Sequence, residues 1–134
     1  MSKLYYSWKD FDNDVTAIVK MIKENKLDIK NVYGVPRGGL VMGVAISHRL
    51  DKPMILDKAK ITKGTLIVDD ILDTGKTLNK LWKNGFLPPC VLCWNDAKLQ
   101  KNKIPHVIVG TETKGKWVVF PWETKKTSKY DNTI

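Results

Sequence analysis

The sequence predicts an α/β protein with a single domain: a mostly parallel, twisted sheet of about five strands, flanked by helices, with a small C-terminal hood. Short, continuous apolar segments alternate with segments of helical length along most of the chain. Such strands are typical of parallel sheets that are covered on both faces. The 134 residues suffice for one hydrophobic core. Within the single domain, 1–134, we expect the core over about 11–110, the hood segment over about 111–124 and a polar tail over 125–134.

Local signals predict the individual elements. Asp10 can cap a helix from about Phe11 to Asn25, because apolar residues recur there at helical spacing. A buried strand over 31–35 stops at Pro36, and a second helix begins at the glycine pair 38–39 and runs to about 50. A third helix, from 75 to about 84, ends at Gly85, a residue that favours a helix C-terminus. The other apolar runs predict strands over 53–56, 65–69, 90–94 and 106–109 and an extended piece over 117–120.

Composition excludes several classes of protein. Hydrophobic residues make up 43% of the chain and charged residues 28%, which is typical of a globular protein rather than a disordered one. No apolar run approaches the ~18–20 residues that cross a bilayer, and the N-terminus lacks the apolar core of a signal peptide. Two cysteines, Cys90 and Cys93, agree with a reducing compartment. We therefore expect a cytoplasmic protein with no membrane partner.

The net charge of +9 has two readings, a solvated basic surface or a field that gathers polyphosphate substrates. The basic residues are nearly all lysine, and only Arg37 and Arg49 are arginine. Proteins that read bases in a duplex usually rely on the planar fork of arginine. Nucleic acid is therefore the less favoured partner.

The segment 66–78 carries the chemistry. An apolar strand ends in Asp69 and Asp70, a third carboxylate follows at Asp73, and the run 74–77 (Thr-Gly-Lys-Thr) begins a helix. A helix start offers free N–H groups to a phosphate, but neighbouring carboxylates repel it unless a cation or hydroxyls lie between. A phosphorylated sugar with a metal-bound pyrophosphate satisfies the whole segment. The nucleotide-binding P-loop is excluded, because that motif requires glycine where Asp70 stands.

The segment resembles the signature of the type I phosphoribosyltransferases, in which an aliphatic strand leads into paired acids and then acid-Thr-Gly-x-Thr. The resemblance implies that Asp69 and Asp70 bind the ribose hydroxyls and take part in holding Mg²⁺. It implies that Asp73 is a catalytic residue that assists proton transfer near N7 of the base. The 5-phosphate would be held by Thr74, Gly75, Lys76 and Thr77.

A second stretch, Pro36, Arg37, Gly38 and Gly39, resembles the pyrophosphate loop of the purine-using branch of that family. Glycines let the backbone approach an anion, and Arg37 supplies a charged fork. The resemblance implies a catalytic role for Arg37 on the departing pyrophosphate and a cis peptide between Pro36 and Arg37. Taken alone, a glycine pair most often marks a turn.

The last third of the chain resembles the short bacterial xanthine–guanine (6-oxopurine) phosphoribosyltransferases. The resemblance implies that Lys98 bonds the purine O6, that Trp117 stacks on the ring and that the carbonyl of Val118 reads its 2-position. Glu123 would help to hold Mg²⁺ through water. For each of two residues an alternative role stays open: Lys98 could be an ordinary surface lysine, and Trp117 could pack in the core.

Two features stand apart from this pattern. Cys90 and Cys93 are spaced like metal ligands, but structural zinc needs four ligands and only His106 lies nearby, so we expect buried structural thiols. The long loop that relatives carry between the second and third core strands is replaced by the eight residues 57–64. A connection of this length cannot form a broad lid, although Lys58, Lys60 and Lys63 can reach over the pyrophosphate.

The resemblance implies an Mg²⁺-dependent purine-salvage enzyme, and a homodimer. Its reaction would transfer the 5-phosphoribosyl group from phosphoribosyl pyrophosphate to guanine, xanthine or hypoxanthine, giving the nucleoside monophosphate and pyrophosphate. Two alternatives stay open. One is a non-catalytic regulator on the same fold that senses phosphoribosyl pyrophosphate or binds RNA; the other is a phosphoribosyltransferase for a different base.

Overall fold

The computed structural model describes residues 2–95 and 104–124. Its five-stranded sheet is parallel throughout, with strand order β3-β2-β4-β5-β6, and a separate two-stranded parallel sheet joins β1 to β7. The predicted α/β class with a parallel sheet of about five strands is therefore confirmed. In chain order the elements are β1 (Lys3–Tyr5), α1 (Trp8–Glu24), β2 (Asn31–Gly34), α2 (Gly38–Leu50), β3 (Met54–Ile55), the 3₁₀ turn η1 (Lys58–Lys60), β4 (Thr65–Leu72), α3 (Lys76–Leu81), β5 (Cys90–Trp94), β6 (Ile108–Glu112) and β7 (Trp117–Val119).

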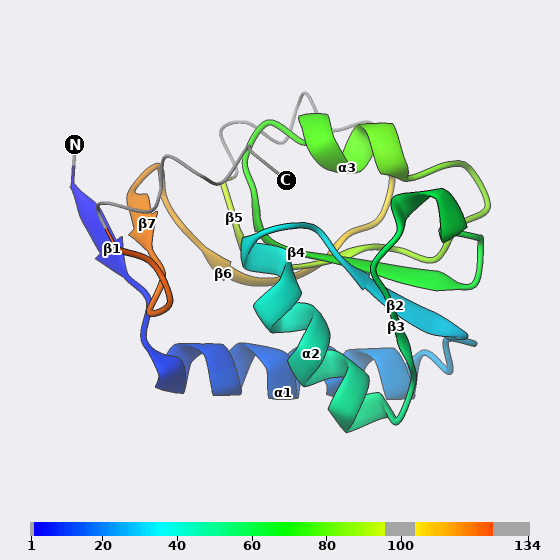
Figure 1. Ribbon diagram of the computed structural model, residues 1–134. Helices are drawn as coiled ribbons and strands as arrows, with labels where there is room; N and C mark the ends of the chain where they lie inside the picture. Colours follow the sequence, from blue (N-terminus) through cyan, green and yellow to red (C-terminus); the bar gives the residue numbers. More distant parts are fainter. Residues whose placement is uncertain (1, 96–103, 125–134) are drawn as a thin grey trace.

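Helices cover both faces of the sheet, with α1 and α2 on one face and α3 on the other (Figure 1). The buried residues form two clusters that correspond to these faces. One cluster packs α1 and α2 on the strands, with Val15, Ile18, Met42, Ile46, Leu66, Val68 and Leu92 among its members. The other packs Leu78 of α3 against Tyr33, Ile67 and Val91. Alternate strand residues therefore serve opposite faces, as a pleated sheet requires.

The helix α1 begins three residues before the predicted start. Ser7 is the N-cap residue, and its hydroxyl accepts a 3.0 Å hydrogen bond from the N–H of Asp10. The Asp10 carboxylate in turn accepts from the N–H of Ser7 at 2.9 Å, which completes a capping box. The prediction that Asp10 itself caps the helix was therefore wrong, because an aspartate three residues into a helix can reach back to the cap.

The strand β4 is longer than predicted. It continues through Asp69 and Asp70 to Leu72, because β5 goes on pairing with it as far as Trp94. On the other side, β2 has already ended at Gly34, opposite Val68. The two acids thus belong to a strand that has a neighbour on one side only, and the chain that follows β2 occupies the other side.

Three smaller boundaries also differ from the sequence-based expectation. The helix α3 ends at Leu81, with the extended residue Trp82 as its C-cap, so Gly85 is not the cap residue. The strand β6 covers 108–112 rather than 106–109. The strand β1 was not predicted, and its pairing of Lys3 with Trp117 brings the start of the chain to β7. We call β1, β7 and residues 120–124 the hood. In the described part of the chain, no helix is long and apolar enough to span a membrane.

Candidate functional site

A cavity of about 590 Å³ lies where the hood faces the carboxyl ends of the parallel strands. Ligands of open α/β sheets usually bind at this edge. Its lining comes from the loop between β2 and α2, the end of β4, the start of α3, and the hood. Of the residues predicted to form the site, Pro36, Arg37, Gly38, Asp69, Asp70, Asp73, Thr77, Trp117, Val118 and Glu123 line this cavity.

The acidic pair packs directly against the beginning of α2. A Cβ atom on Gly38 would overlap Oδ2 of Asp70, and one on Gly39 would lie 2.8 Å from the carbonyl oxygen of Val68. Both glycines are therefore required by the close approach of α2 to β4. Gly39 is buried behind this contact, whereas Gly38 also lines the cavity.

The surroundings of Asp69 disfavour the ionised form of its carboxyl group. Its pKa is raised well above the ordinary value of 3.8, first because burial withdraws the charge from water and second because the Asp70 carboxylate is adjacent. The N–H of Asp70 donates a 2.8 Å hydrogen bond to Oδ1 of Asp69 and opposes this rise. A ligand that brings hydroxyl donors or a cation would relieve the repulsion between the two acids.

The peptide bond between Pro36 and Arg37 is cis, as the resemblance implied. Arg37 is the N-cap residue of α2 and has helical backbone angles. Arg37 lines the cavity together with Pro36, in the loop that follows the end of β2. Arg37 thus belongs to the same cavity wall as Asp69 and Asp70.

The loop between β4 and α3 divides into two parts. Asp73 and Thr77 line the cavity, as does Lys80 of α3, which the sequence did not single out. Gly75 has φ 80°, a left-handed conformation that glycine adopts without strain. The other three residues of the predicted phosphate loop, Thr74, Gly75 and Lys76, do not line the cavity in the described structure.

The hood contributes an exposed indole to the cavity. The side chain of Trp117 is 58% exposed and lines the cavity, whereas Val118 beside it is buried. Core packing is therefore excluded as the role of Trp117. Glu123 also lines the cavity, and its Oε1 accepts a 3.0 Å hydrogen bond from the N–H of Phe120, which fixes the carboxylate at the base of the hood.

One predicted site residue lies outside the described part of the chain, and other residues of the cavity wall were not predicted. Lys98, the predicted contact to O6, falls outside the described residues. Asn95 and Thr113 line the cavity but were not among the residues predicted to form the site. For Asn95 the available signal was positional, since it is the polar residue that directly follows the predicted strand 90–94. Thr113 follows β6 only because that strand continues to Glu112, beyond its predicted end.

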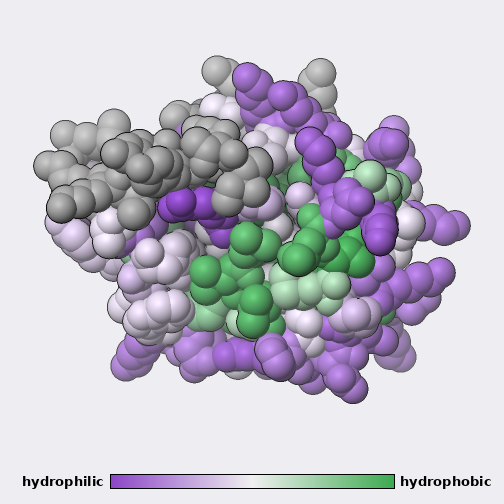
Figure 2. Space-filling view, in the orientation of Figure 1, coloured by the Kyte–Doolittle hydropathy of each residue, from purple (hydrophilic) through white to green (hydrophobic). Residues whose placement is uncertain are grey.

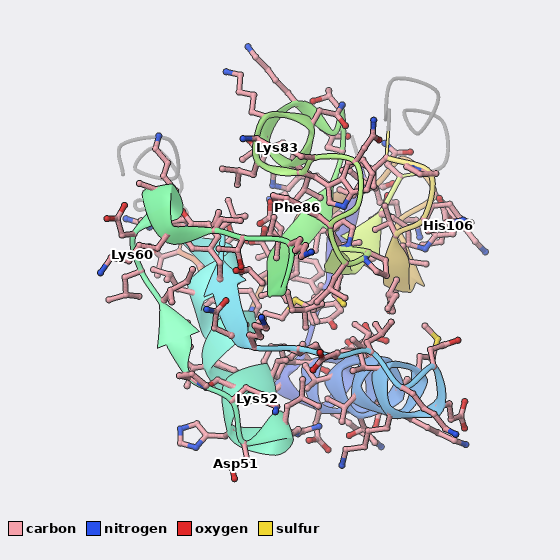
Figure 3. All side chains as sticks on the ribbon, turned by 90° about the vertical axis from the view of Figure 1, so that its right-hand side faces the viewer. Asp51, Lys52, Lys60, Lys83, Phe86 and His106 are labelled. Carbon is pink, nitrogen blue, oxygen red and sulfur yellow. The ribbon has the colours of Figure 1, made fainter. Side chains whose placement is uncertain are left out.

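The cysteines are buried structural thiols, as predicted. Both are free, and burial raises the pKa of each, so they stay protonated at neutral pH. His106 lies on the exposed loop that leads into β6, with Phe86 and Lys83 on the loop before β5, at the edge away from the hood (Figure 3). Among residues 2–95 and 104–124, no three His, Cys, Asp or Glu side chains form a group that could hold a metal ion.

The eight residues that replace the expected lid form the short turn η1. The Asp57 carboxylate accepts a hydrogen bond from the N–H of Ala59 at 2.9 Å and caps this turn. Figure 3 shows Lys60 on this turn, on the opposite side of the sheet from Asp51 and Lys52, which follow α2. Of the three lysines expected over the pyrophosphate, Lys58 lines the cavity.

No protein-family model matches the chain. Among curated proteins, the xanthine-guanine phosphoribosyltransferase of Nitratidesulfovibrio vulgaris (strain DP4) is 24% identical, and the match covers 89% of this chain and 83% of that protein. The enzyme of the same name from Cereibacter sphaeroides is 25% identical, over 89% of this chain and 86% of its own length.

Solved phosphoribosyltransferase structures resemble this chain in fold. The purine phosphoribosyltransferase of Pyrococcus horikoshii Ot3 is 29% identical with a TM-score of 0.69, over 92% of this chain and 96% of that one. The Helicobacter pylori xanthine-guanine-hypoxanthine phosphoribosyltransferase has a TM-score of 0.74 at 20% identity, over 93% and 96% of the two chains. On fold, cavity and relatives together, the chain is an enzyme of the phosphoribosyltransferase type, built on the type I fold and similar to the short xanthine–guanine phosphoribosyltransferases.

Proposed function

We propose that the chain transfers the 5-phosphoribosyl group of phosphoribosyl pyrophosphate to a 6-oxopurine base in purine salvage. The products are the nucleoside monophosphate and pyrophosphate. The observation that carries this proposal is that Asp69, Asp70 and Asp73 face one cavity together with Arg37 and Trp117. Acceptors for sugar hydroxyls, a cation for a departing pyrophosphate and an aromatic ring for a base are thereby available within one space.

The acidic pair binds the ribose. Its carboxylates accept hydrogen bonds from the 2- and 3-hydroxyls, and each such bond favours the ionised form of the acid. The raised pKa of Asp69 supports this role, because a carboxylate that is expensive to ionise in the free protein gains most from hydroxyl donors. Thr77, at the start of α3, contributes its hydroxyl to the 5-phosphate. Thr74, Gly75 and Lys76 remain predicted members of that phosphate loop.

Arg37 and Lys58 act on the pyrophosphate. As the bond from the anomeric carbon breaks, negative charge grows on the leaving group, and fixed cations in the cavity stabilise it. Gly38 lets the backbone at the start of α2 come close to the same oxygens, with Pro36 and Gly39 shaping the turn. Asp73 receives or returns the proton at N7 as the base forms its new bond.

Trp117 stacks on the purine, and the carbonyl of Val118 reads its 2-position. Stacking on an aromatic ring contributes ~1–3 kcal/mol per base in other nucleotide-binding proteins. The names of the relatives, xanthine-guanine phosphoribosyltransferases, support a 6-oxopurine over other bases. Lys98 remains the predicted contact to O6.

Mg²⁺ is the predicted cofactor. Asp69, Asp70 and Glu123 offer carboxylate oxygens along the cavity, which are the ligands that Mg²⁺ prefers. Mg²⁺ is commonly held by one or two carboxylates together with substrate phosphates, so the absence of a three-ligand group in the described residues fits such a site. When bound, the ion would neutralise charge on the pyrophosphate.

The proposal includes a homodimer in the cytoplasm. Figure 2 shows apolar residues gathered over α2, and Val44 of this helix is 48% exposed. Leu56, which follows β3, is 74% exposed. This surface is the one that a second copy would cover. Sedimentation equilibrium of the purified protein at micromolar concentration gives the mass, and a monomer would remove the dimer from the proposal.

The function is tested with a panel of bases. The protein is mixed with phosphoribosyl pyrophosphate, Mg²⁺ and, separately, guanine, xanthine, hypoxanthine, adenine and orotate, and nucleotide formation is followed by chromatography. We expect product from one or more of the three 6-oxopurines and little from adenine or orotate. Omission of Mg²⁺ with a chelator tests the cofactor in the same assay. Product from adenine or orotate alone would show that the enzyme uses a base other than a 6-oxopurine. Saturable binding of phosphoribosyl pyrophosphate without any product would favour the non-catalytic sensor.

A further inference from the structure

Thr113 carries a hydroxyl group that the fold buries without using. The residue is 2% exposed, and its Oγ1 has no hydrogen-bond partner within the described chain. Burying a hydroxyl without a partner costs free energy, so such groups are rare in native proteins. Thr113 also lines the cavity. A molecule that enters the cavity can therefore supply the partner: water in the free protein, and a ligand when one is bound.

The position of Thr113 follows from the register of the sheet. The strands β4, β5 and β6 end side by side, and the residue after each end is polar: Asp73, Asn95 and Thr113. The N–H of Asn95 donates to the carbonyl of Leu72 at 3.1 Å, and the N–H of Thr113 donates to the carbonyl of Trp94 at 2.8 Å. These two bonds hold the three residues in one row, and all three line the cavity.

The length of this row suits a flat bicyclic ligand. Neighbouring strands lie about 4.8 Å apart, so roughly 10 Å of backbone separates Asp73 from Thr113. A purine fits between hydrogen-bonding groups at this spacing. With Asp73 at N7 of the five-membered ring, as proposed above, Thr113 stands at the edge of the six-membered ring. Trp117, four residues further along the chain, then lies against the face of the same ligand.

We propose that Thr113 is a specificity-determining residue whose Oγ1 hydrogen-bonds a polar atom of the six-membered ring of the base. The inference rests on the proposed function, because it requires a heterocyclic base in the cavity. It adds to that function a side-chain contact from the end of β6, separate from Lys98 and from the carbonyl of Val118. Asn95, the middle residue of the row, lies beside the same edge.

The test compares Thr113→Val with Thr113→Ser in steady-state kinetics on the preferred base. Valine keeps the shape of threonine and removes the hydroxyl, so we expect KM for the base to rise about tenfold with kcat and KM for the donor little changed. Serine keeps the hydroxyl and should restore most of the base affinity. The thermal midpoint of ligand-free Thr113→Val should not fall, because the lost hydroxyl bonds no other group of the described chain.

Thr111→Val is the matched control on the same strand. The Thr111 hydroxyl donates a 2.7 Å hydrogen bond to Oδ2 of Asp14, so its loss should lower the thermal midpoint without a selective change in KM for the base. An active wild type with an unchanged base KM in Thr113→Val would overturn the role of Thr113 alone. A wild type that uses no base at all would overturn the proposed function and this inference together.

Discussion

Tyr6, the residue that follows the hood strand β1, donates a 2.6 Å hydrogen bond to Oδ2 of Asp14 in α1. The Tyr6 N–H also donates to the carbonyl of Val119, and the tyrosine ring packs edge-on against Phe120 with centroids 5.2 Å apart. Asp14 in turn accepts from Thr111 of β6. The Asp14 carboxylate of α1 thus bonds both Tyr6, which contacts the hood, and Thr111 of the main sheet.

Tyr6→Phe should loosen the hood. The substitution removes one donor to a charged acceptor, so we expect a loss of about 1–2 kcal/mol of unfolding free energy together with a rise in KM for the base. Burial and the neighbouring Asp14 raise the pKa of Tyr6, so the hydroxyl stays protonated and the contact should hold throughout the neutral range. Thermal melts and kinetics measure both effects. Tyr5→Phe is the control, because Tyr5 is 71% exposed, and equal effects in both variants would contradict the prediction.

Asp69→Asn should stabilise the ligand-free protein at neutral pH. The folded-state pKa of Asp69 lies above its ordinary value, so its cost is absent below that value, where the acid is protonated in both states. The cost grows as pH rises from the ordinary value to the folded pKa, because over that range only the unfolded chain releases the proton, and it is constant above the folded pKa. We expect a gain on the order of 1 kcal/mol at neutral pH that shrinks toward acid pH.

Melting curves of the wild type and Asp69→Asn at several pH values isolate this group, because other titrations cancel in the difference. The same variant should bind the donor more weakly, since asparagine offers the ribose hydroxyls or a cation one neutral oxygen in place of two charged ones. A variant less stable than the wild type at neutral pH would show that the Asp69 carboxylate is not strained in the free protein.

Gly38→Ala should disturb the donor site through packing. Its Cβ would overlap Oδ2 of Asp70, so either α2 or the acid must move, at a cost of about 1–3 kcal/mol. We expect a lower thermal midpoint and a raised KM for phosphoribosyl pyrophosphate. Gly64→Ala is the matched control, because its Cβ would meet only the flexible side chain of Lys30. A similar KM for phosphoribosyl pyrophosphate in the two alanine variants would show that Gly38 does not shape the donor site.

Asp73→Asn should separate binding from turnover. Asparagine fills the same space but cannot take up a proton, so we expect kcat to fall by about 10²–10⁴-fold, the usual contribution of a general acid or base. The affinity for phosphoribosyl pyrophosphate, measured by calorimetry, should change little. Unchanged kcat would remove Asp73 from the catalytic residues.

The sequence predicted an element correctly where neighbouring residues alone determine its bounds. The strand at 90–94 and the helix at 38–50 were predicted at their observed bounds, because a continuous apolar run and a glycine pair after proline are local signals. The continuation of β4 from Asp69 to Leu72 was missed, since polar residues normally end a strand and only the register with β5 continues it.

The hood and the row at the strand ends required contacts between distant parts of the chain. The three residues of β1 carry no sequence pattern that predicts the pairing of Lys3 with Trp117, and so short a strand is not stable alone. Thr113 gave no local signal either, because its unused hydroxyl becomes meaningful only when burial and the cavity are known.

Trp117→Ala should weaken base binding with little effect on folding. The indole is 58% exposed, so its removal costs little buried area, while loss of stacking should raise KM for the base roughly tenfold or more. Trp117→Phe keeps an aromatic face and should recover part of the affinity. Trp8→Ala is the control, because Trp8 is similarly exposed at 55% but packs against Phe11 and Trp122. If Trp117→Ala and Trp8→Ala changed the base KM alike, the effect would come from the hood as a whole rather than from stacking on Trp117.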